Sequence, residues 1–415
     1  MKKNKKTDIS KIAKDKEKEG RMRDYWKEPV PKKVNKKKII TITIIISVVI
    51  AIISVLVVYY NNKSAREWID RILLRKEVMQ DKVNTIELKE NQNMNLYAFN
   101  KYIGILNKNR FTIYGNTGNE ETNLEIQISN PIFDSANRFL VIAEKKGKKL
   151  YLINDKDIIW EANVEGNISQ IHVNKNGYVA VVITDTSYKT VINVYSPEGE
   201  GKPKFKTYLS STRTADIAIS NDNKHLAIAE VDTSGTIIQS NIKIISVDKA
   251  STDPTNSLEN TYKGETDKLI TSIKYQDKNK LICMYTDSIH IIENGQDTIL
   301  MSNEKRKMIF QSIQLTNHAM QIEERSSGLF TADSVVNIIN TENRGTKEYM
   351  VNSVTKEIYT YGNIMALNLG TEIEFINTEG WLVKRYVAYQ EITDIIMSNN
   401  LAGIVYRDKI EIINL

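Results

Sequence analysis

Cysteine is almost absent from this sequence, and so are the motifs of the commonest enzyme classes. Cys283 is the only cysteine, so no disulfide can form within the chain. It lies in an apolar run, Leu281–Tyr285, where a free thiol is typically an inert core residue. The sequence also lacks a P-loop and the patterns G-x-G-x-x-G, H-E-x-x-H, G-x-S-x-G and C-x-x-C. These absences exclude the nucleotide, zinc-protease and esterase sites that such motifs mark.

Histidine is scarce, and the acidic residues that attract notice fall in turn-like segments. The histidines are His172, His225, His290 and His318, without metal-ligand spacing. We expect each to be an ordinary strand or turn residue, and a shared site requires that the fold bring them together in a central channel. Aspartate in turns commonly bonds its own backbone, which is the role expected of Asp185, Asp222, Asp232 and Asp287. The sequence therefore predicts no catalytic, cofactor-binding or metal-binding residue.

The positive charge of the chain is confined to its N-terminus. Residues 1–38 hold 16 of the 57 Lys and Arg and 6 of the 51 Asp and Glu, so this tail carries +10 and the remaining 377 residues carry −4. A basic balance restricted to a tail gives little support to nucleic-acid binding, and we expect none. The tail has too few apolar residues to fold alone. We expect a disordered, solvated tail, with a docking motif at residues 21–29 as the alternative.

One long apolar run follows the tail. Residues 39–60 contain no charged residue and, as a helix, would span about 33 Å at about 1.5 Å per residue, close to the roughly 30 Å of a bilayer core. A signal peptide has a shorter apolar region and a small-residue cleavage site, and neither is present. Lysines beside a span are retained in the cytoplasm. The sequence predicts an uncleaved signal anchor with residues 1–38 cytoplasmic and the C-terminal domain extracytoplasmic.

A short helix is expected between this span and the rest of the chain. Residues 64–67 form a capping box, in which a Ser and a Glu satisfy the first amides of a helix. Apolar residues then recur at roughly helical spacing within residues 61–82. The pattern covers barely two heptads, so it favours a short amphipathic linker helix over a dimerising coiled coil.

From Val83 onward the apolar period is two, and short strands recur in sets of four. Each set covers roughly 35–50 residues, the size of a β-propeller blade. The sets begin near residues 95, 131, 168, 216, 270, 308, 364 and 392. The last set has three strands, and Val83–Leu88 would supply the fourth and close the ring. Residues 83–415 are thus predicted to form an all-β, eight-bladed propeller, with seven blades or a split β-sandwich pair as alternatives.

Two connections in this domain are longer than hairpin loops. They cover Ser196–Lys204 and Lys249–Lys268. Because long loops are more often functional than incidental, we expect one of them to contact a partner outside the membrane.

The repeats resemble a known family. Segments such as Phe133–Val141 and Asn176–Val182, together with the basic tail and anchor, are similar to Gram-positive single-pass membrane proteins that carry a quinoprotein-like or WD40-like propeller of unknown function. The resemblance covers essentially the whole chain and implies fold and placement, but no chemistry. Only Trp160 and Trp381 lie within the repeats, whereas quinone-dependent dehydrogenases have tryptophan-rich repeats, so no quinone cofactor is implied.

The expected function is a non-catalytic binding or assembly module at the cell envelope, with a protein partner. The alternative is an enzyme, a hydrolase or lyase, whose polar residues gather in the propeller channel, because fold alone does not exclude catalysis. A sensor that signals through the tail is a third possibility, although 38 residues leave no room for a cytoplasmic catalytic domain.

Overall fold

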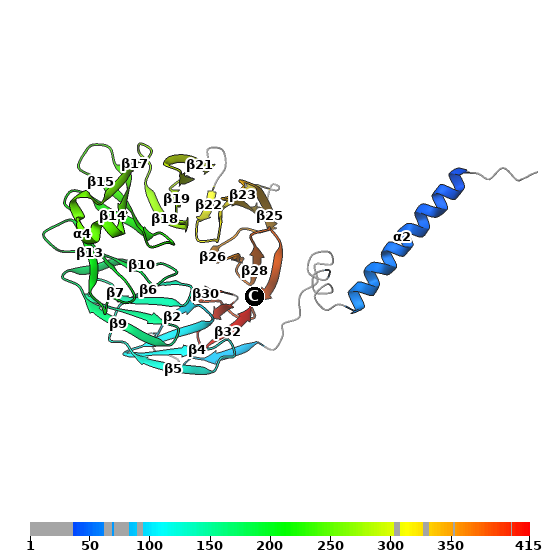
Figure 1. The fold of residues 1–415 in the computed structure, drawn as a ribbon. Helices are drawn as coiled ribbons and strands as arrows, with labels where there is room; N and C mark the ends of the chain where they lie inside the picture. Colours follow the sequence, from blue (N-terminus) through cyan, green and yellow to red (C-terminus); the bar gives the residue numbers. More distant parts are fainter. Residues whose placement is uncertain are drawn as a thin grey trace, which may run out of the picture. The chain divides into compact units, whose positions relative to one another are not determined.

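The computed structural model describes residues 36–61, 69, 83–88, 94–302, 308–326, 332–351, 353–399 and 401–415 (Figure 1). The predicted tail lies outside the described residues except for its last three. The predicted linker helix, within residues 61–82, also lies outside them apart from residues 61 and 69.

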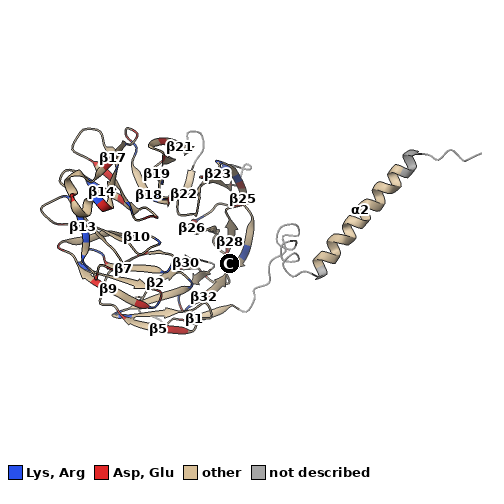
Figure 2. Cartoon of the chain, in the orientation of Figure 1, with Lys and Arg blue, Asp and Glu red and all other residues tan. Residues whose placement is uncertain are grey.

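The apolar run forms one long helix, α2 (Lys36–Asn61). The segment Ile40–Tyr59 is long and apolar enough to cross a membrane. It is the only such helix among the described residues, and Figure 2 draws this segment without a charged residue. Its Ile and Val residues are only modest helix formers in water. In lipid a helix is favoured because it satisfies every backbone polar group internally.

The described strands form eight four-stranded antiparallel sheets arranged as blades around a ring (Figure 1). Within seven of the blades each strand pairs with the strand that follows it in the chain, so these blades are simple meanders. The predicted eight-bladed propeller is therefore confirmed. A seven-bladed ring and a sandwich pair are both excluded by the strand order.

The first four blades run consecutively along the chain. Blade 1 is β2 (Met94–Phe99), β3 (Tyr102–Asn107), β4 (Arg110–Tyr114) and β5 (Glu120–Glu125); blade 2 is β6 (Pro131–Ala136), β7 (Phe139–Glu144), β8 (Lys149–Asn154) and β9 (Asp157–Asn163); blade 3 is β10 (Asn167–Val173), β11 (Val179–Thr184), β12 (Thr190–Tyr195) and β13 (Pro203–Leu209); blade 4 is β14 (Arg213–Ile219), β15 (His225–Asp232), β16 (Gln239–Ser246) and β17 (Leu258–Lys263).

The last four blades complete the ring. Blade 5 is β18 (Ile270–Asp277), β19 (Lys280–Tyr285), β20 (Ser288–Glu293) and β21 (Gln296–Ser302); blade 6 is β22 (Met308–Ser312), β23 (His318–Ser326), β24 (Ala332–Asn340) and β25 (Thr346–Val351); blade 7 is β26 (Glu357–Tyr361), β27 (Ile364–Asn368), β28 (Glu372–Asn377) and β29 (Leu382–Val387); blade 8 is β30 (Asp394–Ser398), β31 (Leu401–Val405), β32 (Lys409–Asn414) and β1 (Asn84–Glu87).

Blade 8 is closed by strands from the two ends of the domain. Its order is β1-β32-β31-β30, and Ile86 of β1 pairs with Ile410 of β32. The predicted contribution of Val83–Leu88 is confirmed. Closure protects sheet edges that an open array would leave for pairing with another chain.

The hydrophobic core lies between neighbouring blades. One cluster joins blades 2 and 3 through buried residues such as Leu152, Trp160 and Val181, and another joins blades 3 and 4. These segments form strands because their β-branched and aromatic residues fit a pleated surface that is covered on both faces.

The ring has two faces, which the connections between strands define. We call the face where β1 begins the proximal face, and it carries the connections from first to second and from third to fourth strand of each blade. Asn84 lies there because it pairs with Ile412, near the end of β32. The distal face carries the remaining connections, including hairpin 185–189.

Three local predictions differ from the structure. Residues 249–268 are not one loop: they contain most of the helix α4 (Val247–Thr252), the 3₁₀ turn η1 (Pro254–Asn256) and the outer strand β17. The fourth strand expected near residues 124–128 lies at Glu120–Glu125, and β26 comes before the strands expected for its blade. The other long connection is present as residues 196–202 between β12 and β13.

Candidate functional site

The first strand of each blade is the innermost, and these strands surround the central channel of the propeller. They contact one another around most of the ring. Many of their side chains are half-buried rather than fully buried; in β6 every residue is half-buried. Polar residues on these strands therefore converge at the axis although they are far apart in sequence.

Asp134 and His172 form the centre of this convergence. The Oδ2 atom of Asp134, on β6, lies 3.4 Å from Nδ1 of His172 on β10. The same oxygen accepts a hydrogen bond from the backbone N–H of Val173 at 2.7 Å. The exposed fractions of the two side chains are 32% and 25%, so the pair faces open space inside the ring.

Asp216 repeats the same backbone contact two blades further along. Its Oδ2 accepts hydrogen bonds from the backbone N–H of Ile273 and from the Ser272 hydroxyl, both at 2.8 Å. Its Oδ1 accepts from the N–H of Ile217 at 2.9 Å. Each of these aspartates thus joins the inner strand of its own blade to the inner strand of the next, which is a structural role.

Lys274 supplies a cation to the same region. It lies on β18, and its Nζ donates to the backbone oxygen of Gln314 at 2.6 Å. It interacts electrostatically with Asp134 and with His172. We call Asp134, His172, Asp216 and Lys274, with Tyr97 and Tyr361, the axial cluster.

The two tyrosines approach the cluster from blades 1 and 7. The Ser135 hydroxyl donates to the Tyr97 hydroxyl at 3.4 Å, and Tyr361 also interacts with Ser135 and Asp134. The Tyr97 ring stacks on Phe133, with centroids 5.1 Å apart. Burial raises the pKa of both hydroxyls, so both keep their protons at neutral pH.

Burial also moves the pKa values of the charged groups toward their neutral forms. It raises the pKa of Asp134 to about 7, against the opposing hydrogen bonds from backbone amides. It lowers the pKa of His172 to about 4, with a further lowering by Lys274, and lowers that of Lys274 to about 8. A carboxyl group that titrates near pH 7 beside a neutral imidazole is suited to proton transfer.

The other histidines do not join this cluster. His290 is 3% exposed and lies within blade 5, with Nδ1 3.0 Å from Asp297 and Nε2 3.3 Å from Glu265. His318 bonds to the backbone oxygen of Thr316 and to Asn340. These contacts lie within blades 5 and 6 and the connection that leads into blade 5. Within the described residues no group of three or more His, Cys, Asp or Glu could hold a metal ion.

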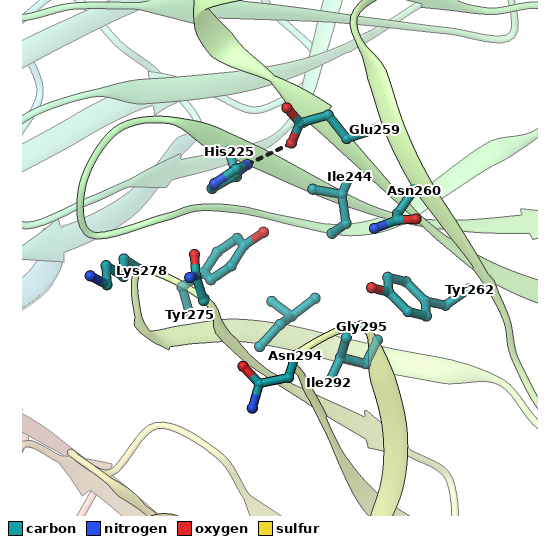
Figure 3. A pocket seen from close by; sticks show the side chains of 12 residues that line it. His225, Ile244, Glu259, Asn260, Tyr262, Tyr275, Lys278, Ile292, Asn294 and Gly295 are labelled. Carbon is teal, nitrogen blue, oxygen red and sulfur yellow. Dashed lines mark hydrogen bonds and ion pairs between the residues drawn. The ribbon is translucent and has the colours of Figure 1, made fainter.

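His225 borders a separate pocket between blades 4 and 5 (Figure 3). Its Nδ1 lies 2.9 Å from Oε2 of Glu259, and Tyr262 directs its hydroxyl toward the pocket (Figure 3). Apolar side chains such as Ile244 and Ile292 form part of the wall. The cavity measures about 210 Å³, below the roughly 300–1,000 Å³ of most small-molecule sites. We therefore regard the axial cluster as the stronger candidate.

The turn aspartates lie where the sequence places them. Asp222 accepts from Ser220 and from the N–H of Lys224, and Asp232 accepts from Ser234. Asp185 has a left-handed backbone, with φ 57°, and accepts from Asn167. Asp287 forms an ion pair with Lys268 at 3.2 Å.

Sequence reasoning placed His172 in a strand and named the channel as the place where it could matter, but it missed Asp134, Asp216 and Lys274. A signal was present: Asp134 and Asp216 each occupy the fourth position of a first strand. A carboxylate at the same distance from the start of two first strands is a pattern that a comparison of the repeats would have shown.

A patch of apolar side chains lies on the distal side of blades 3 and 4. Tyr188 and Tyr208 are 42% and 50% exposed, and their ring centroids are 4.8 Å apart. Ile237 and Ile238, in the hairpin 233–238, are 51% and 44% exposed. Lys189, beside Tyr188, acts electrostatically on Asp232, just before that hairpin. We call Tyr188, Tyr208, Ile237 and Ile238 the distal patch.

The fold and the axial cluster define an eight-bladed β-propeller with polar residues gathered at its axis, in a chain whose described part also includes a membrane-length apolar helix. The chain belongs to a family of unknown function, DUF5711, whose profile matches residues 75–415.

Several solved structures are similar in fold. BamB from Moraxella catarrhalis is 12% identical, with a TM-score of 0.48, and the match covers 80% of this chain and all of BamB. Apo AztD from Citrobacter koseri is 11% identical, with a TM-score of 0.46 and coverage of 76% and 90%. Sqt1 from Chaetomium thermophilum, solved with the N-terminus of ribosomal protein L10, is 10% identical, with a TM-score of 0.48 and coverage of 80% and 99%. No curated protein matches the sequence.

Proposed function

We propose that this chain is a single-pass membrane protein whose propeller lies outside the cell membrane and binds a protein partner there. The apolar helix and the lysines before it support the anchor and its orientation, because basic residues beside a span are retained in the cytoplasm. The Gram-positive origin is a prediction from the sequence resemblance. The propeller acts in this proposal as a rigid platform rather than as an enzyme.

The distal patch is the observation that carries the binding role. Four large apolar side chains, each 42% or more exposed, lie on the distal side of two adjacent blades, as a tyrosine pair on blade 3 and an isoleucine pair on blade 4. Exposed apolar residues that gather in this way mark interaction sites more often than scattered ones do, and tyrosine is enriched at the centres of protein interfaces. The first strand of the domain, β1, begins on the proximal face, whereas the distal patch lies on the opposite face of the ring.

Site-specific photocrosslinking in cells tests this proposal. We expect a crosslinkable amino acid at position 188 or 237 to capture the same discrete protein. The same amino acid at position 175, an exposed position in a proximal turn, is the control and should not capture it.

Substitutions provide the matched comparison. Ile238→Asp should abolish the crosslink from position 188, because a charge in the patch opposes its burial. Ile299→Asp changes an isoleucine on β21, outside the patch, that is 58% exposed against 44% for Ile238, and should leave the crosslink intact. The same products from all three positions, or a crosslink that survives Ile238→Asp, would contradict the proposal.

Acid–base catalysis in the channel is the second candidate function, and the contact between Asp134 and His172 favours it. It predicts turnover of some member of a panel of esters, glycosides and uronic-acid polymers by the purified full chain. His172→Gln should reduce that turnover by about a hundredfold or more, the usual contribution of a general acid or base. Activity that persists in His172→Gln, or no activity on the panel, would count against a hydrolase or lyase.

A further inference from the structure

The hydrogen-bond acceptors of the axial cluster are already occupied by the protein. Asp216 accepts from two backbone amides and one hydroxyl. Asp134 accepts from the amide of Val173, interacts with that of Ser135 and lies against His172. Both carboxylates therefore meet the donors of neighbouring inner strands, and little acceptor capacity remains for a ligand.

The donors of the cluster are in surplus. An ammonium group has three N–H donors, and among the described residues Lys274 Nζ donates to a single acceptor, the Gln314 oxygen. The Tyr97 hydroxyl accepts a hydrogen bond from Ser135, which leaves its own proton free to donate. The Tyr361 hydroxyl adds another donor near Ser135.

The cluster is also reachable from one end of the channel. Tyr97, Ser135, His172 and Tyr361 all lie within the last three residues of their strands, next to the turns of the proximal face. The side chains of His172 and Asp134 remain a quarter to a third exposed. A small molecule can therefore meet the two tyrosine hydroxyls from this face, and Lys274 of β18 interacts electrostatically with Asp134 and His172 beside them.

We propose that the axial cluster binds a small organic oxyanion, a carboxylate or phosphate compound, with Lys274 as its countercharge and the Tyr97 and Tyr361 hydroxyls as further donors. A site with one cation and a surplus of O–H and N–H donors matches an acceptor-rich anion, and a charge-assisted hydrogen bond is about twice as strong as a neutral one. The proposal is independent of the anchor, of the distal patch and of catalysis.

The charged groups around the site give anion binding a defined pH dependence. Those that face Lys274 or its neighbours are Asp134 on β6, His172 on β10 and Asp216 on β14, with Tyr97 and Tyr361 beside them. Because the pKa of Asp134 is about 7 and that of Lys274 about 8, rising pH adds a negative charge and then removes the positive one. Affinity should fall across this interval, and binding near pH 7.5 should take up protons.

Calorimetric titration of the purified full chain in detergent micelles tests the site, with citrate and inorganic phosphate as probes at constant ionic strength. We expect at least one probe to bind, with affinity about tenfold weaker at pH 8.5 than at pH 6.5. Citrate alone would indicate a carboxylate ligand, and phosphate alone a phosphorylated one. Heats no larger than those of chloride for both probes would overturn the proposal.

Three variants separate the site from general damage. Lys274→Met should weaken binding about tenfold or more, whereas Lys278→Met, an exposed lysine four residues further on, should leave it unchanged. Tyr361→Phe removes one hydroxyl and should weaken binding several-fold. Asp134→Asn should strengthen binding and flatten its pH dependence, because it removes the opposing charge.

The gain of affinity in Asp134→Asn is the decisive result, because a damaged fold cannot produce it. Thermal unfolding identifies any variant that does not fold, and in that case Tyr361→Phe replaces Lys274→Met as the test. Equal binding by Lys274→Met and Lys278→Met, or weaker binding by a folded Asp134→Asn, would overturn the proposal.

Discussion

His172 couples the stability of the ring to pH. In an unfolded chain a histidine titrates near pH 6.5, whereas burial lowers the pKa of His172 to about 4 in the folded chain. The unfolded state therefore binds a proton that the folded state excludes. The stability that the folded state gains by keeping His172 neutral is fully present above about pH 6.5 and is lost as the pH falls toward 4.

We expect His172→Gln to remove this part of the acid sensitivity. The free energies of unfolding of wild type and variant should converge or cross as the pH falls from about 6.5 to about 4. Urea unfolding across this range measures the difference. Stability curves that stay parallel would show that His172 titrates normally.

Cys283 is the second residue whose chemistry follows from its surroundings. It is 0% exposed, and burial raises the pKa of its thiol well above the usual value. Since the thiolate is the reactive form, iodoacetamide should not label the folded chain but should label it in concentrated guanidinium. Mass spectrometry of both samples measures this, and rapid labelling of the folded chain would contradict the expected burial.

Residue roles could be predicted only where the local pattern determines them. The apolar run around Cys283 indicates its burial correctly. Asp134 and Lys274 lie in strands whose apolar and polar residues alternate, and in such strands a polar residue is expected to face solvent. Which face of a strand meets the axis depends on the position of that strand in its blade and on closure of the ring, and neither is encoded within six residues of sequence.

The closing strand β1 is short, so a single side chain accounts for much of its packing. Ile86 is 3% exposed and packs with Ile103, Leu401 and Ile412. Ile86→Ala should destabilise the propeller by about 2–5 kcal/mol, the usual cost of such a truncation in a core. Glu87→Ala changes the exposed neighbour and should cost no more than about 0.5 kcal/mol. Chemical denaturation measures both, and equal effects would show that closure does not depend on this packing.

Asp216 holds two blades together through their innermost strands. Asp216→Ala leaves the amides of Ile217 and Ile273 without their acceptor, and each unsatisfied buried group costs about 1–3 kcal/mol. Asp216→Asn keeps a carbonyl oxygen and should restore part of the loss. Asp232→Ala is the control, because the partner of Asp232, Ser234, lies in the same hairpin. Equal thermal shifts for the two alanine variants would exclude a joining role.

Most elements could be predicted because β-branched residues alternate with polar ones along them. The exceptions have a physical explanation. The outer strand β17 reads Leu-Glu-Asn-Thr-Tyr-Lys and has no buried residue, so it carries no apolar signal and depends on pairing with β16. The segment before β17 forms the helix α4, which Ser246 caps, and the 3₁₀ turn η1. From the sequence alone this segment looks like a single polar loop.

The topology of the whole chain gives a further prediction. If the lysines retain the N-terminus in the cytoplasm, protease added to intact, wall-stripped cells should digest the propeller and spare the first few dozen residues. Antibodies against each end of the chain measure this. A propeller that resists protease until the cells are lysed would indicate the opposite orientation, provided that the purified propeller is cleaved under the same conditions.

The pairing of β1 with β32 also sets the order of events during synthesis. The first strand of the domain to be synthesised, β1, has no pairing partner until β32 has been made. A chain that lacks β32 therefore keeps an open ring with an unpaired strand edge. Such an edge exposes the chain to proteolysis and aggregation. The ring of this propeller can therefore close only after its C-terminal strand has been synthesised.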